Sequence, residues 1–158
     1  MPQTLQYGLI APDDPALAGL IDRHAAESAR HYPADSNHHL DGPALAAQGA
    51  ILFAARLGGP DGPVRAMGGY APLSATEAEI KSMHVETALR GQGAGARILT
   101  LILDHAKASG FARLWLETGS LPASAPARRL YARAGFTPCP PFGTYRPDPM
   151  SVFMTRTL

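Results

Sequence analysis

The stretch Arg90-Gly91-Gln92-Gly93-Ala94-Gly95, here called the glycine turn, lies between a strand-like run and a helix-like run. Side-chain character alternates with period two from 78 to 85, and apolar residues recur at helical spacing from 96 to 108. Glycines let backbone N–H groups converge in a turn, and a helix N-terminus adds unpaired donors with partial positive charge. The sequence therefore predicts a binding site for a phosphate-bearing ligand.

The composition is that of an ordinary globular protein and excludes several classes of partner. The chain has 158 residues, 46% of them hydrophobic and 17% charged, and a net charge of +1. We therefore expect one domain over 1–158, no nucleic-acid partner and no membrane association. The single Cys139 cannot form an intrachain disulfide and is flanked by prolines, so we expect it to be passive. The lack of a charged segment followed by an apolar core at the N-terminus predicts a cytoplasmic location.

The segments around the glycine turn predict a mixed α/β (α+β) fold. Six residues rich in glycine and proline at 58–63 join two strand-like runs and predict a hairpin. Asp13 and Asp14 ahead of Pro15 mark a helix start, and Gly110 and Gly135 mark helix ends. The other expected elements are strands at 5–10, 50–56, 64–70, 114–117 and 151–155, and helices at 15–32, 43–48 and 126–134.

Three kinds of phosphate-bearing ligand are candidates for the glycine turn. A mononucleotide P-loop needs Gly-Lys-Ser/Thr, but Gly95 precedes Ala96 and Arg97, which excludes that loop. Residues 91–96 satisfy the loose dinucleotide pattern, yet 86–90 separate them from the strand, and too little chain follows for a two-halved sheet. The third candidate is the pyrophosphate of coenzyme A.

Two motifs carry a resemblance to a known family. Arg90-x-x-Gly93-x-Gly95 resembles the Arg/Gln-x-x-Gly-x-Gly/Ala signature of the GNAT N-acetyltransferase superfamily. Residues 130–136 are similar to its Leu-Tyr-x-x-x-Gly-Phe motif, residues 79–85 to the strand before its signature, and the tail 141–152 to small bacterial members of unassigned substrate. The resemblance implies a central mixed, mostly antiparallel sheet flanked by about four helices, and acetyl-CoA as co-substrate.

The resemblance also implies which residues hold the cofactor. Amides of the glycine turn would bind the pyrophosphate, and the preceding strand would pair with the pantetheine arm and donate to the thioester oxygen. Ser124 stands where many members carry an asparagine, which changes the donor set there. The implied cofactor-binding residues are Met83, His84, Val85, Arg90, Gly91, Gln92, Gly93, Ala94, Gly95, Ser124 and Tyr131.

Acetyl transfer needs a neutral nucleophile, a polarised carbonyl and a proton for the departing thiolate. Tyr131 matches the tyrosine that acts as general acid in many members; the alternative is a core tyrosine on an apolar helix face. Glu79 matches a glutamate that acts as base, often through water; the alternative is a strand carboxylate paired with Lys81. His84 is a weaker base candidate, because strict alternation places it on the opposite strand face from Glu79.

The family's fold brings the loop after the first helix and the C-terminal hairpin to the acceptor. The expected substrate contacts are Tyr32, Asn37, His38, His39, Phe142 and Tyr145. Their chemistry suits N-acetylation of the primary amine of a small molecule or amino acid by direct attack on the thioester. The alternatives are acetylation of a protein N-terminus or lysine, and a non-catalytic acyl-CoA-binding module. Four histidines (24, 31, 38 and 39) lack a familiar ligand spacing, so no metal is expected. A homodimer is consistent with the family.

Overall fold

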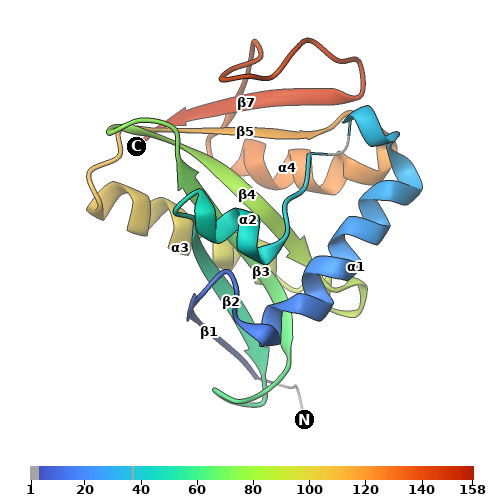
Figure 1. Cartoon of the computed structure of the whole chain (residues 1–158), viewed down its shortest axis with the longest axis vertical. Helices are drawn as coiled ribbons and strands as arrows, with labels where there is room; N and C mark the ends of the chain where they lie inside the picture. Colours follow the sequence, from blue (N-terminus) through green and yellow to red (C-terminus); the bar gives the residue numbers. More distant parts are fainter. Residues whose placement is uncertain (1–3, 37) are drawn as a thin grey trace.

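The computed structural model describes residues 4–36 and 38–158, which form one seven-stranded sheet with helices on both faces (Figure 1). The strand order is β1-β2-β3-β4-β5-β7-β6, and only the β4–β5 pair is parallel. This confirms the predicted mixed, mostly antiparallel sheet and the hairpin over 58–63. The strands are β1 (Leu5–Ile10), β2 (Ile51–Leu57), β3 (Val64–Pro72), β4 (Glu77–Val85), β5 (Arg113–Gly119), β6 (Thr137–Cys139) and β7 (Ser151–Thr157), and the helices are α1 (Pro15–His31), α2 (Gly42–Ala47), α3 (Ala94–Ala108) and α4 (Ala125–Arg133).

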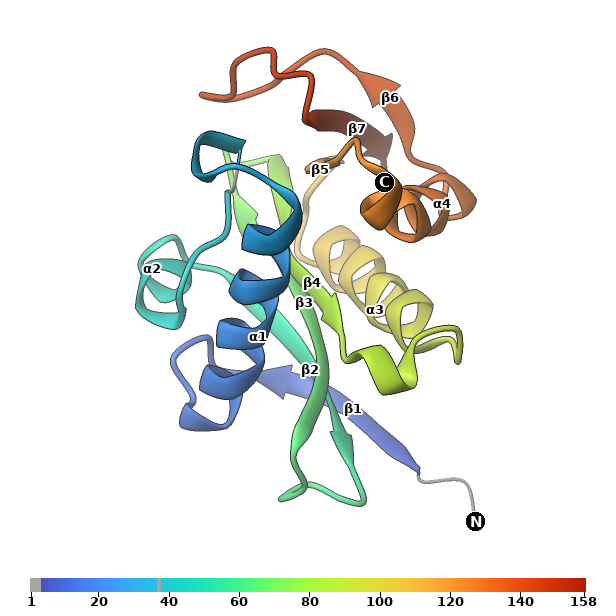
Figure 2. The same cartoon turned by 90° about the vertical axis from the view of Figure 1, so that its right-hand side faces the viewer.

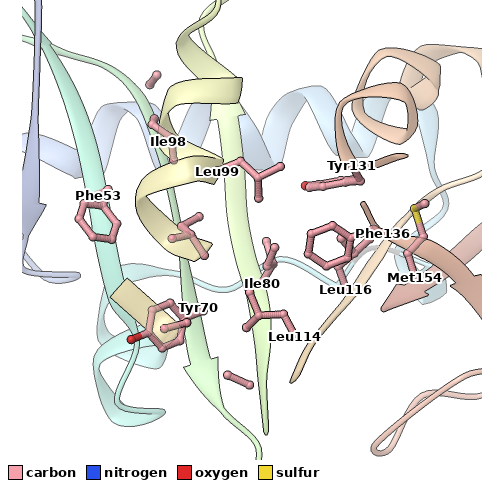
Figure 3. Close-up of a cluster of buried hydrophobic side chains, with 14 of the residues drawn as sticks. Phe53, Tyr70, Ile80, Ile98, Leu99, Leu114, Leu116, Tyr131, Phe136 and Met154 are labelled. Atoms are coloured by element: carbon pink, nitrogen blue, oxygen red, sulfur yellow. The ribbon is translucent and has the colours of Figure 1, made fainter. Parts of the chain in front are cut away.

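Helices α1 and α2 cover one face of the sheet, and α3 and α4 cover the other (Figure 2). The face under α1 and α2 buries Leu17, Leu20, Leu45, Leu52 and Met67. The face under α3 and α4 buries a larger cluster around Ile98, Leu99, Ile102, Leu114 and Leu116, to which α4 contributes Tyr131 (Figure 3). No helix among the described residues is both long enough and apolar enough to cross a membrane.

Strands β4 and β5 pair along only a small part of their length. The ladder joins Glu77–Glu79 to Arg113–Trp115, whereas β4 continues to Val85 and β5 to Gly119. Beyond this ladder, the edge of β4 that faces β5 has no strand partner among the described residues. The sheet therefore opens in its middle, next to the glycine turn.

A β-bulge in β4 changes which side chains share a face. β3 residues Met67 and Gly69 pair with His84 and Lys81, so β4 holds one residue more than β3 between these pairs. Ser82, inside the bulge, has a φ of 59°. Because one extra residue reverses the alternation beyond it, His84 lies on the same face as Glu79. The predicted placement of His84 on the opposite face is wrong for this reason.

Candidate active site

A cavity of about 800 Å³, the main cavity, occupies the opening between β4 and β5. One wall comes from α1 and the loop that follows it, and the opposite wall from the start of α3 and from α4. The β4 residues from Glu79 to Val85 and the end of β5 line it between these walls. The main cavity therefore connects the two faces of the sheet.

The glycine turn presents a row of unpaired backbone donors at one end of the main cavity. Gly91 and Gly93 have φ of 77° and 88°, values that non-glycine residues rarely adopt, and Gly93 is the N-cap of α3. No described residue accepts a backbone hydrogen bond from the N–H groups of 91–96. At Gly95 a Cβ would lie 3.3 Å from the Leu130 side chain. The turn fits a pyrophosphate, because free donors and the α3 N-terminus converge there.

The side chain of Arg90 ties the glycine turn to α1. Its guanidinium donates two hydrogen bonds to Glu27, at 2.8 and 2.6 Å, and its Nε donates to the carbonyl of Val85 at 2.9 Å. This pairing lowers the pKa of Glu27 and raises that of Arg90. Arg90 is therefore held against protein atoms rather than extended into the cavity, and Glu27 is a site residue that the sequence prediction missed.

Two neutral histidines lie next to this tie. His24 Nδ1 and His84 Nδ1 are 3.0 Å apart, and His84 Nδ1 is 3.7 Å from Glu27. Burial lowers the pKa of His24 to about 4 and also lowers that of His84. At neutral pH one imidazole donates to the other, so the nitrogen of His84 that faces α1 is already engaged.

Tyr131 contributes to the wall of the main cavity from α4. Its ring packs against Phe136, with centroids 5.9 Å apart, and the residue is 5% exposed. In Figure 3 the hydroxyl points away from α4, toward the β4 side. Burial and, to a lesser degree, the charge of Glu117 raise the pKa of Tyr131 well above its usual value. The phenol therefore stays protonated at neutral pH and can donate a proton.

Glu79 is 4% exposed, and both of its carboxylate oxygens have partners. Lys81 Nζ lies 3.1 Å from Oε1, and the Tyr145 hydroxyl donates to Oε2 at 2.5 Å. The predicted alternative, a strand carboxylate paired with Lys81, is thus present in the structure. A Glu79 base would have to act while keeping these two partners.

A second carboxylate, Glu117 at the end of β5, also lines the main cavity. The Ser151 hydroxyl donates to its Oε2 at 2.6 Å. Burial is the largest effect on Glu117 and raises its pKa. Sequence analysis missed this residue, although a glutamate directly after the buried Leu114 and Leu116 is a signal in itself.

Four of the expected acceptor residues line the main cavity. His38, His39 and Tyr145 line the main cavity, with the rings of His38 and Tyr145 5.1 Å apart. Tyr32 also lines it. The Tyr32 hydroxyl lies 2.7 Å from Ser124 Oγ and accepts from the Leu121 N–H at 3.0 Å. Tyr32 and Ser124 therefore join the end of α1 to the connection between β5 and α4.

Phe142 requires a correction. It is 9% exposed, lines neither this cavity nor the second one described below, and packs behind Tyr145 against Trp115 and Phe153. Because the ring belongs to an aromatic cluster, it supports Tyr145 instead of facing a substrate. Asn37 lies outside the described residues.

A second cavity, of about 770 Å³, adjoins the main one. The two share His38, His39, Leu40, Glu79, Lys81 and Tyr145. The second cavity continues to the β3–β4 turn and to Thr144 and Arg146 of the β6–β7 loop. Across residues 4–36 and 38–158, no group of three or more His, Cys, Asp or Glu is placed to hold a metal ion.

The main cavity thus brings together an opened sheet, a turn with free amides at a helix N-terminus, and a buried phenol. Residues 16–136 match the family model described as the acetyltransferase (GNAT) family, and the chain belongs to that family. It is 38% identical over 143 residues to the IAA acetyltransferase of Azospirillum brasilense, covering 87% of this chain and 86% of the relative.

Solved structures agree with this assignment. A Klebsiella pneumoniae protein assigned to the acyl-CoA N-acyltransferases superposes with a TM-score of 0.78 at 26% identity, over 98% of both chains. The Salmonella typhimurium protein yncA, solved with acetyl-CoA, gives a TM-score of 0.69 at 19% identity, over 97% of this chain and 93% of that one. The chain is therefore an acetyltransferase, as the resemblance implied.

Proposed function

We propose that this enzyme transfers the acetyl group of acetyl-CoA to the primary amine of a small molecule or amino acid. The observation that carries the proposal is the main cavity, which passes through the sheet from the glycine turn to the buried carboxylate of Glu79 and the half-buried carboxylate of Glu117. A donor bound from the α3–α4 side would meet an acceptor that enters from the α1 side. Attack on the thioester can then be direct, with no acyl-enzyme.

Backbone groups hold the donor in this proposal. The free N–H groups of 91–96 bind the pyrophosphate, and the unpaired edge of β4 from Ile80 to Val85 pairs with the amides of the pantetheine arm. An N–H of the same edge donates to the thioester oxygen and stabilises the negative charge that develops there. Arg90 contributes by fixing the glycine turn to Glu27.

Two groups of the chain move the protons. The neutral amine attacks the thioester carbon, and the resulting ammonium releases a proton to a carboxylate. We infer that Glu117 accepts it, directly or through water, because Glu117 lines the main cavity and burial raises its pKa. Glu79 keeps its contacts with Lys81 and Tyr145 and orients them. The C–S bond then breaks, and Tyr131 gives its proton to the thiolate.

Contacts between two loops favour a small acceptor over a peptide. Ser36, after α1, donates to Asp148 of the β6–β7 loop at 2.5 Å, and His38 packs on Tyr145 of the same loop. A peptide groove would need an open channel between these loops, whereas the contacts bridge it. The buried Tyr131 and the half-buried Glu117 both line the cavity, and this favours catalysis over a non-catalytic acyl-CoA-binding module.

The test is thiol release from acetyl-CoA across a panel of small amines, amino acids and peptides, with product masses measured. The panel includes IAA, the molecule in the name of the Azospirillum relative. Small amines or amino acids are expected to be acetylated. Acetylation of peptides alone would establish the peptide alternative, and acetyl-CoA binding without release above background would establish the binding module.

A further inference from the structure

We propose that the acceptor carries a carboxylate in addition to its amine, and that Lys81 and Arg146 bind this carboxylate in the second cavity. The proposal rests on the proposed function, since it names the class of acceptor for the same site. It comes from the charges and the unused donors of the second cavity.

Lys81 is the central residue of this subsite. Its side chain is 14% exposed and lines both cavities. An ammonium has three N–H donors, and one of them serves Glu79 at 3.1 Å. No other described residue gives Lys81 a hydrogen bond or an ion pair. Glu79 has a second partner besides Lys81, because its other carboxylate oxygen accepts a hydrogen bond from Tyr145. Lys81 thus keeps donors for an anionic ligand at the junction of the cavities.

Arg146 adds a second cation at the outer part of the second cavity. It is exposed, and no described residue forms an ion pair or hydrogen bond with it. Among the residues that line this cavity, the charged ones are Lys81, Arg146 and Glu79, so cations outnumber carboxylates. The fork of an arginine matches the two oxygens of a carboxylate. The second cavity therefore favours an acid group over a neutral or cationic one.

The opposite charge lies on the other side of the junction. Glu117 lines the main cavity but not the second one, and it offers a carboxylate to an approaching amine. An acceptor with its acid group on Lys81 and Arg146 can extend its amine past Tyr145 toward Glu117 and the thioester. The acceptor class is thus a small molecule with both a primary amine and a carboxylate. The pyrophosphate of the donor is not a rival ligand, because the glycine turn does not line the second cavity.

The test compares amino acids with their carboxamides, which keep the amine and the size but lose the negative charge. We expect kcat/KM of the wild-type enzyme to fall about tenfold to a hundredfold from acid to amide, the usual effect of charge-assisted hydrogen bonds. In Arg146→Ala the difference between acid and amide shrinks severalfold, with the loss mainly in KM for the acid. Lys81→Arg keeps the charge and retains the preference. Arg30→Ala, which removes an exposed arginine that lines neither cavity, leaves it unchanged.

Calorimetric binding of the same pairs to the acetyl-CoA complex, or to the CoA complex if turnover interferes, separates the two proposals. Tighter binding of acids without thiol release would support the carboxylate subsite and overturn the proposed reaction. Acetylation of acids and amides at equal rates would overturn the subsite and leave the reaction standing. A preference for aminoalkyl phosphates, or no member bound better than its amide, would also overturn it.

Discussion

The tie between Arg90 and Glu27 allows a sharp test of how the signature arginine works. If Arg90 acts as a tether, Glu27→Gln should weaken acetyl-CoA binding although Glu27 belongs to α1, far away in the sequence. The two hydrogen bonds, at 2.6 and 2.8 Å, are charge-assisted, a class that contributes about 1.5–3 kcal/mol when shielded from water. The side chains of Arg90 and Glu27 are 44% and 30% exposed, which reduces this to about 1 kcal/mol. One kcal/mol corresponds to about a fivefold rise in the Kd for acetyl-CoA.

A double-mutant cycle separates a tether from a direct ligand of the phosphates. For a tether, Glu27→Gln, Arg90→Gln and the double variant should each raise the Kd by about the same factor, because each removes the ion pair that joins the glycine turn to α1. For a direct ligand, Arg90→Gln alone should weaken binding strongly, and Glu27→Gln should have no effect or strengthen it. Binding is measured by titration calorimetry.

Glu86→Gln supplies the matched control for this cycle. It removes the same charge near the glycine turn, from a carboxylate that pairs with Arg65 and Arg23 and does not line the main cavity. We expect its Kd for acetyl-CoA to stay within about twofold of wild type. A strong loss in Arg90→Gln with wild-type binding in Glu27→Gln would refute the tether.

Three further predictions concern the acid, the glycine turn and pH. Tyr131→Phe should lower kcat about a hundredfold while the KM for acetyl-CoA stays within about twofold, and steady-state thiol release that shows an unchanged kcat would remove Tyr131 as the acid. Gly93→Asp should abolish acetyl-CoA binding in calorimetry, because it strains a φ of 88° and adds a negative charge, whereas Gly110→Asp, at a φ of 92° beyond the other end of α3, should bind normally. His24 has a folded pKa of about 4, below the ordinary 6.5. As the pH falls from about 7 to about 5, the free energy of unfolding should therefore decrease by about 2 kcal/mol, because the unfolded chain binds the proton on His24 more readily than the folded chain does. Urea denaturation should show that His24→Gln reduces this pH dependence, and an unaltered slope would contradict it.

The sequence predicted the parts of the site that local chemistry determines. Free amides at the glycine turn follow from residues adjacent in sequence, because glycine conformations and a helix start are local properties. Tyr131, which lines the main cavity, was a candidate because Gly135 and Phe136 accompany it at a fixed offset. The strand and helix positions were close for the same reason, although α3 begins at Ala94 and not at 96.

The parts that were missed depend on contacts between distant segments. The placement of His84 failed because a bulge depends on pairing with β3, and no glycine or proline in β4 marks it. Glu27 continues the helical stripe of Leu17, Leu20 and His24, a pattern of a helix that passes from a core onto a cavity. That Lys81 and Glu117 line the same cavity could not be predicted from the sequence, because it depends on the opening of the sheet between β4 and β5.

The short ladder between β4 and β5 has a mechanical consequence. β1–β4 and β5–β7 are two half-sheets whose strands pair at only three residue pairs, and the buried cluster around Leu116 and the Tyr145–Glu79 hydrogen bond also join them. A ligand that fills the opening links the two half-sheets, because it forms contacts with both of them at once. Its binding energy is added to the cohesion of the fold, about 2.7 kcal/mol at a hundredfold excess over Kd. In a cell rich in acetyl-CoA, the co-substrate would thus also stabilise the folded state of the enzyme that consumes it.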